Sequence, residues 1–142
     1  MKNKNEMKIK AVSLSSSLTV QELIDASKRN KINIFDLDAI KDELQLELAF
    51  FHAKSAFEDG ENIGKDMLME VMIRSAGTRQ ISDAIKKVGV KNPKRIVVAY
   101  NTAKVKLTES QIKSALNAKK ITWKQSNSEK EIRQMVQIEL ED

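Results

Sequence analysis

The chain has 142 residues, with 25 Lys or Arg against 20 Asp or Glu, one histidine and no cysteine. This composition excludes disulfides, thiolate chemistry and the common zinc sites, because one histidine cannot supply four zinc ligands. The length is that of one domain with one compact core. The most apolar stretch, residues 44–57, is too short to cross a bilayer, and the N-terminus lacks a signal peptide, so we expect a cytoplasmic protein without membrane contact.

Charge is segregated along the chain. Residues 36–70 contain ten acidic residues against three lysines, whereas residues 71–106 contain nine Lys or Arg against Asp83 alone. The two blocks can be neighbouring faces that neutralise each other, or the basic block can be a footprint for a polyanion such as nucleic acid. The charge pattern taken alone favours the first interpretation.

The predicted elements begin after a basic N-terminal tail, residues 1–6, which we expect to be flexible. Apolar residues alternate from Met7 and predict a half-buried strand, and Thr19 with Glu22 predicts a helix that starts with a capping box. A second strand is predicted at 32–35. Asp36 and Asp38 follow it and can either hold a metal or cap a turn; the cap is favoured.

Three helices are predicted between residues 43 and 88. The first, 43–58, is apolar around nearly its whole circumference, which predicts burial on more than one side. The second begins near residue 67 and ends at Gly77 in a left-handed conformation, after which Thr78 is expected to cap the third. His52 in the first helix is interpreted as a structural histidine, because no orienting acid for a general base is evident around it.

The remaining elements follow the only proline, Pro93. Residues 96–100 form a continuous apolar run, which predicts a strand covered on both faces at the centre of the sheet. Thr108 opens another capped helix, a short strand is predicted at 121–123, and a last helix starts after Ser128. The order β-α-β-α-α-α-β-α-β-α predicts one α/β (α+β) domain over residues 7–142, with a mixed sheet of about four strands covered by about six helices.

No phosphate-binding loop, dinucleotide fingerprint, nucleophile elbow or H-E-x-x-H motif occurs, so we expect a binding protein rather than an enzyme, without metal or cofactor. The best candidate site is RSAGTRQ, residues 74–80. Free N–H groups at a helix start would lie there beside Arg74 and Arg79, which suits an anion such as phosphate. Arg74 can instead form an exposed pair with Glu70, and Arg79 can pair with the acidic block. These grounds leave both interpretations open.

Residues 47–90 contain the patterns H-A-x-x-A-F-x-x-G-x-N-I and A-G-T-R-Q-I-S-x-A-I-x-x-x-G. With them the chain resembles the small-subunit family of KEOPS complexes, which includes the PRPK-binding protein. The resemblance implies a non-catalytic accessory role in making threonylcarbamoyladenosine in tRNA. It also implies partners: a kinase-like ATPase subunit, tRNA contacted at its 3′ CCA end and acceptor region, and, indirectly, the metal-dependent transferase subunit.

The resemblance marks a set of residues for tRNA binding. Arg74 and Arg79 suit phosphate, while the other members suit base edges, sugars, stacking or further phosphates. The whole predicted set is His52, Asn62, Arg74, Thr78, Arg79, Gln80, Lys86 and Lys87.

The kinase-like partner needs a second surface. The last predicted helix carries more apolar residues than one inward stripe requires, although all of them can also close the core. They are Ile132, Met135, Val136, Ile138 and Leu140. The alternative function is a pure protein-interaction module that regulates a kinase-like protein without contacting RNA.

Overall fold

The computed structural model describes residues 7–125, in which four strands form one sheet in the order β2-β3-β1-β4. The strands are β1 (Ile9–Ser16), β2 (Asn33–Asp36), β3 (Ile96–Asn101) and β4 (Ala118–Lys120). The α/β class and the four strands are confirmed. The expected mixed sheet is corrected, because every strand pair is antiparallel. β1 and β2 run parallel to each other, but β3 lies between them and pairs with both.

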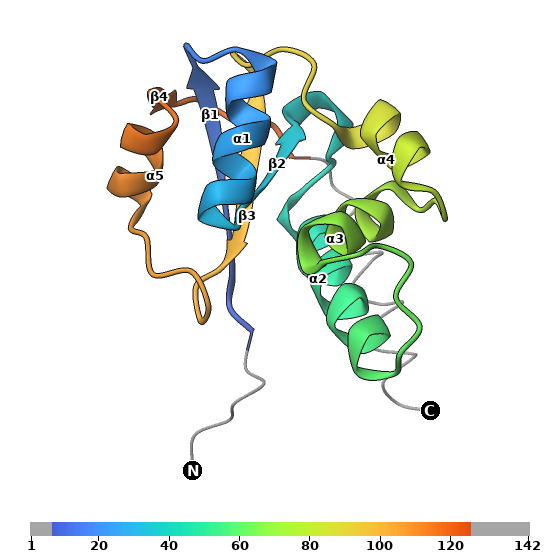
Figure 1. Cartoon of the computed structure of the whole chain (residues 1–142). Helices are drawn as coiled ribbons and strands as arrows, with labels where there is room; N and C mark the ends of the chain where they lie inside the picture. The colour runs from blue at the N-terminus through green and yellow to red at the C-terminus, as the bar shows by residue number, and fades with distance from the viewer. Residues whose placement is uncertain (1–6, 126–142) are drawn as a thin grey trace.

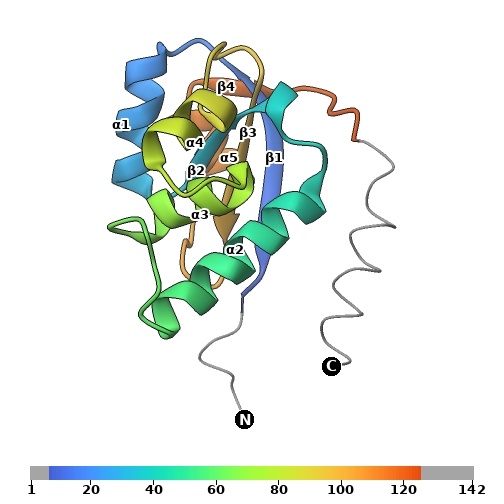
Figure 2. The ribbon, with the colours of Figure 1, turned by 90° about the vertical axis from the view of Figure 1, so that its right-hand side faces the viewer.

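Helices cover both faces of this sheet (Figures 1 and 2). α1 (Val20–Asn30) and α5 (Glu109–Ala115) pack on one face, whereas α2 (Glu43–Glu58), α3 (Met67–Ala76) and α4 (Ile81–Val88) pack on the other. A 3-10 turn, η1 (Leu37–Ala39), links β2 to α2. The predicted element order is confirmed as far as β4. The predicted tail, residues 1–6, and the predicted last helix lie outside the described residues.

β3 holds the two layers together. Its side chains alternate between the faces: Val97 and Ala99 join the core under α2, α3 and α4, and Ile96, Val98 and Tyr100 join the core under α1 and α5. All five are fully buried. A strand with both faces covered has no polar side to alternate with, which explains the continuous apolar run in the sequence.

Two strands differ from their predictions. β1 is buried on both faces over Val12–Leu14 rather than half-buried, because Val12 and Leu14 join the core under α1 and α5 and the Ser13 hydroxyl, on the other face, donates to the Ile121 carbonyl at 2.6 Å. The last strand is β4, three residues before the predicted 121–123. Asn117 adopts a left-handed conformation with φ of 48° and turns the chain immediately after α5. The exposed edge strand that follows carries lysines, which no apolar pattern reveals.

Local capping is confirmed at several predicted positions. Thr19 and Thr108 form reciprocal capping boxes with Glu22 and Gln111. Asp36 accepts a hydrogen bond from the Asp38 N–H at 3.2 Å and caps η1, so the cap interpretation is confirmed for Asp36, whereas the Asp38 carboxylate instead pairs with Arg95. Burial of α2 on more than one side is not complete, since Phe51 is 51% exposed.

Candidate nucleic-acid interface

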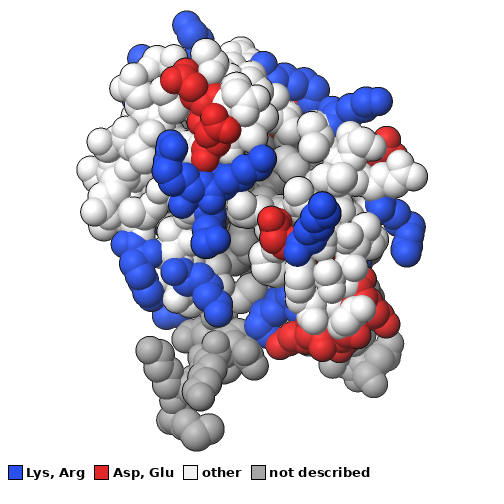
Figure 3. Space-filling view, viewed as in Figure 1, with Lys and Arg blue, Asp and Glu red and all other residues white. Residues whose placement is uncertain are grey.

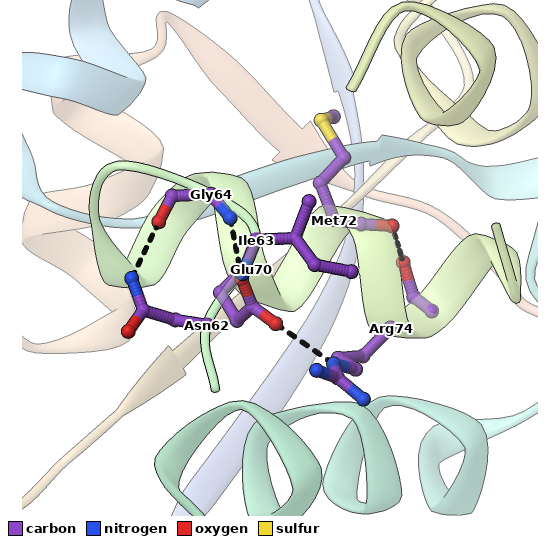
Figure 4. Close-up of polar contacts among 7 residues, drawn as sticks. Asn62, Ile63, Gly64, Glu70, Met72 and Arg74 are labelled. Carbon is purple, nitrogen blue, oxygen red and sulfur yellow. Dashed lines mark hydrogen bonds and ion pairs between the residues drawn. The ribbon is translucent and has the colours of Figure 1, made fainter. Parts of the chain in front are cut away.

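A buried carboxylate organises the start of the candidate site (Figure 4). Glu70 on α3 is fully buried, and its Oε1 accepts hydrogen bonds from the backbone N–H groups of Ile63 at 2.8 Å and Gly64 at 2.6 Å. Its Oε2 accepts from Arg74 Nε at 2.8 Å. One side chain therefore fastens the 62–64 loop and one of the two candidate arginines to the same helix.

The environment of Glu70 keeps it ionised. Burial by itself would raise the pKa of this carboxyl, but hydrogen bonds from Gly64, Arg74 and Ile63 outweigh burial, and the pKa lies below its usual value. The pair with Arg74 was expected to be exposed and worth a few tenths of a kcal/mol. That expectation is corrected, because the carboxylate has no solvent exposure and Arg74 is one-third exposed.

Gly64 permits the loop to reach Glu70. A Cβ atom at this position would lie 2.8 Å from the Cβ of Met69 and 2.9 Å from the backbone nitrogen of Glu70. Only glycine allows so close an approach without a shift of the backbone. Asn62 donates to the Gly64 carbonyl at 2.9 Å and holds the same turn. Asn62, predicted to bind RNA, thus has a structural contact within the loop.

The other end of α3 is closed by its C-terminal cap. Gly77 is left-handed with φ of 68°, as predicted, and its N–H bonds the carbonyls of Ile73 and Arg74. The next two carbonyls accept from side chains, that of Ser75 from Gln45 Nε2 at 3.1 Å and that of Ala76 from Lys87 Nζ at 2.8 Å. Lys87, predicted to contact phosphate, therefore also ties α4 to α3.

The start of α4 differs from its prediction. Thr78 does not cap the helix: α4 begins at Ile81, and the Thr78 hydroxyl instead accepts from the Gln80 N–H at 3.2 Å. Gln80 occupies the N-cap position and makes no side-chain cap hydrogen bond. The connection from α3 to α4 is longer than predicted, and the N-cap moves two residues along the chain, from Thr78 to Gln80. The first N–H groups of α4 consequently receive no side-chain oxygen from the N-cap residue.

The two candidate arginines have different surroundings. Arg74 is held by Glu70, whereas Arg79 is exposed and forms no ion pair with any residue in the range 7–125. Gln80 is exposed next to it in the chain, and Lys86 is exposed in the last turn of α4. The structure therefore leaves Arg79 and Gln80 accessible at the start of α4, whereas Lys86 is accessible in its last turn.

His52 and Asn62 lie on other elements than this cluster. His52 is exposed on α2, where its ring makes an edge-on contact with Phe51 at a centroid distance of 5.6 Å. Sequence reasoning missed Glu70 as the organising residue and Gln45 as a partner of α3. One signal was available for Glu70, since it stands beside Val71 and three residues before Ile73 in a helix that is otherwise apolar on its inner side.

The two charge blocks meet in space. Arg74 pairs with Glu70 at 2.8 Å, Lys91 with Asp36 at 3.6 Å and Arg95 with Asp38 at 2.7 Å. The neutralising interpretation is confirmed for these three pairs. Arg79, Lys86 and Lys94 form no ion pair within the described part of the chain, so they remain available to an outside anion.

The described residues were also searched for other kinds of site. No group of three or more His, Cys, Asp or Glu in residues 7–125 is placed to hold a metal ion. None of the helices in the same range is both long and apolar enough to span a membrane. The predicted kinase-contacting residues, Ile132, Met135, Val136, Ile138 and Leu140, lie outside the range.

The fold and this junction define a small α/β domain in which polar groups around α3 fasten helices and loops to one another. Comparison with protein families identifies it further. The model of the family described as "kinase binding protein CGI-121" matches residues 4–140, so the chain belongs to that family. This is the small-subunit family that the motifs in residues 47–90 predict. A comparison with curated proteins gives no match.

Proposed function

We propose that the protein is a non-catalytic accessory subunit of a KEOPS complex, which docks on the kinase-like ATPase subunit and helps to recruit tRNA through its 3′ CCA end. Membership of a kinase-binding family over residues 4–140 supports the protein partner. The tRNA part rests on one observation, the open start of α4 beside exposed Arg79. Backbone N–H groups and a guanidinium at one place favour a phosphate group.

The proposed RNA contact uses residues that the fold leaves accessible. Arg79 meets phosphate, Gln80 and Thr78 reach a base edge or a sugar hydroxyl, and Lys86 adds a phosphate contact that does not depend on sequence. Arg74 takes a supporting part, because its Nε already binds Glu70. His52 and Asn62 stay as predicted contacts on the neighbouring elements, and Lys87 contributes charge next to its bond with α3.

Filter binding of labelled tRNA tests the RNA part. Arg79→Ala is expected to weaken binding about tenfold, because it removes a charge-assisted contact, while Arg29→Ala, which removes an exposed arginine of α1, should change it little. Trimming the CCA end should weaken binding of the wild type, and affinity should fall steeply with salt. Equal binding of intact and trimmed tRNA would contradict recruitment through the 3′ end.

Arg74 provides an internal comparison when thermal unfolding is measured beside tRNA binding. We expect Arg74→Ala to lower the thermal midpoint, because Glu70 loses its cationic partner, whereas Arg79→Ala should leave the midpoint nearly unchanged. If both variants bind tRNA like the wild type and remain folded, the RNA contact is not at this junction.

The second candidate function is a protein-interaction module without RNA contact. It is favoured by the three ion pairs that neutralise part of the basic block, since basic side chains already paired with carboxylates of the same chain need no RNA phosphate as a partner. In that case the protein alone should not bind tRNA but should copurify with the kinase-like protein. For either function, Val136→Glu is predicted to abolish this capture while circular dichroism shows a folded protein.

A further inference from the structure

A groove of about 690 Å³ opens where the two helix layers diverge beside β2. Most of its lining comes from the end of α1, the loop after β3, the end of α2 and the start of α3, and Met7 and Asn33 complete it. Figure 3 shows this face, with blue side chains gathered beside the hollow. The volume is that of a site for a small organic molecule. It lies at the opposite end of α3 from Arg79 and is therefore separate from the proposed tRNA contact.

Three lysines line one side of the groove. Lys28 and Lys31 come from the end of α1, and Lys104 comes from the loop after β3. None of the three forms an ion pair with a residue between 7 and 125. Lys54, on the α2 side, is instead held by Glu58 at 3.0 Å. Three like charges around one opening repel one another, and a multiply charged anion relieves that repulsion.

The floor of the groove is apolar and includes aromatic rings. Phe57 and Phe50 of α2 lie on one side of it, with Met67 and Leu68 of α3 and Val105 of the loop after β3. Met67 is 38% exposed, although it is a large apolar side chain. A flat heteroaromatic group gains from packing against a phenyl ring and a thioether, so the floor suits a nucleobase.

The two sides of the groove carry opposite charges. Glu58 and Asp66 line the α2 and α3 side, opposite the three lysines. Asp66 accepts a hydrogen bond from the Met69 N–H at 2.9 Å and so already occupies the N-terminus of α3 with a carboxylate. That helix start is therefore closed to a second anion, and a phosphate group is favoured only on the lysine side.

We propose that this groove binds a free nucleoside diphosphate or triphosphate, with the phosphates at Lys28, Lys31 and Lys104 and the base over Phe57 and Met67. A single carboxylate would leave most of the lysine charge uncompensated, whereas two or more phosphates match it. The site does not depend on the proposed function, because no residue of the α3–α4 junction lines the groove.

Isothermal titration calorimetry of the full chain with ADP, pyrophosphate and adenosine tests the proposal. ADP is expected to bind saturably and at least about tenfold more tightly than either fragment, since only ADP occupies both ends of the groove. Lys28→Ala and Lys104→Ala should each weaken ADP and pyrophosphate binding about fivefold to tenfold. Phe57→Leu should weaken ADP binding and leave pyrophosphate binding unchanged.

The matched control is Lys119→Ala, which removes an exposed lysine of β4 that does not line the groove. It should leave ADP binding unchanged, and an effect equal to that of Lys28→Ala would overturn the proposal as non-specific charge attraction. Pyrophosphate binding as tight as ADP would overturn the role of the floor. Binding of an acidic peptide or an RNA 3′ end without binding of ADP would overturn the ligand class. Arg79→Ala should weaken tRNA binding alone, so failure of either proposal can be recognised separately.

Discussion

The two ends of α3 are built in opposite ways, although the family motif covers both. At the N-terminal end, the fully buried Glu70 gathers two backbone N–H groups and Arg74, and these polar groups find partners inside the chain. At the C-terminal end, the helix itself is closed by Gly77, but the turn that follows leads into α4 without a side-chain cap. Arg79 stands there exposed.

The difference separates two arginines that look equivalent in the sequence. Arg74 and Arg79 lie five positions apart on either side of one glycine, and both suit phosphate by chemistry. The fold uses Arg74 to neutralise a buried carboxylate and leaves Arg79 to the solvent. We infer that one motif can contain a stabilising half and a binding half, and that mutations in the two halves should change different measured quantities.

The largest expected effect is on stability, at the N-terminal end of α3 where Glu70 is buried. Glu70→Gln removes the charge that Arg74 and two backbone N–H groups share, and it should lower the free energy of unfolding by about 3 kcal/mol, because a partly buried guanidinium loses its counter-ion. Urea denaturation measures the loss. Glu61→Gln, which alters an exposed carboxylate, is the control and should change stability by less than about 0.5 kcal/mol.

The same residue predicts an acid-dependent stability. Because the pKa of Glu70 is lowered in the folded state, its contribution is complete above the unfolded value near 4.5 and is lost as the pH falls through the folded value. The wild type should therefore lose stability below about pH 4.5 more steeply than Glu70→Gln. Parallel pH profiles of the two proteins would show that Glu70 is not the group responsible.

The contrast between the ends also explains which features can be predicted from sequence. Capping boxes at Thr19 and Thr108, the left-handed Gly77 and the β3 strand depend on neighbouring residues, and all are confirmed. The burial of Glu70 depends on a loop that folds back over its helix. No local spacing specifies that contact, so the pair with Arg74 was expected on the surface.

Two further predictions were wrong for the same reason, namely that local sequence does not specify the contact involved. The mixed sheet was expected because alternating strands and helices suggest parallel neighbours. The insertion of β3 between β1 and β2 instead depends on contacts between residues far apart in the sequence. The start of α4 was placed at Thr78, because threonine is a good N-cap. The turn after Gly77 instead uses the Thr78 hydroxyl for the Gln80 N–H, and the helix starts later.

A smaller effect is expected from Gly64→Ala. Its Cβ would lie 2.8 Å from the Cβ of Met69 and 2.9 Å from the Glu70 nitrogen, so the loop must move away from the Glu70 carboxylate. We expect a loss of about 2 kcal/mol in the free energy of unfolding. Gly60→Ala is the comparison: it has φ of 70° and no neighbour within 4 Å, and backbone strain alone should cost about 1 kcal/mol. Equal losses would mean that close approach at residue 64 is unimportant.

The smallest expected effect is an increase in stability, from a substitution that caps the start of α4. Gln80→Asp supplies the cap that α4 lacks and should raise the free energy of unfolding by about 0.5–1 kcal/mol. The same carboxylate occupies the N–H groups and the positive end of the helix dipole, so it should weaken tRNA binding in the filter assay. Gln80→Ser is the matched control, because a hydroxyl also caps the helix but adds no negative charge beside Arg79. It should give most of the stability gain with a smaller loss of affinity. Stabilisation by Gln80→Asp with unchanged tRNA binding would place the phosphate contact away from the start of α4, because a carboxylate at this N-cap competes directly with a bound phosphate.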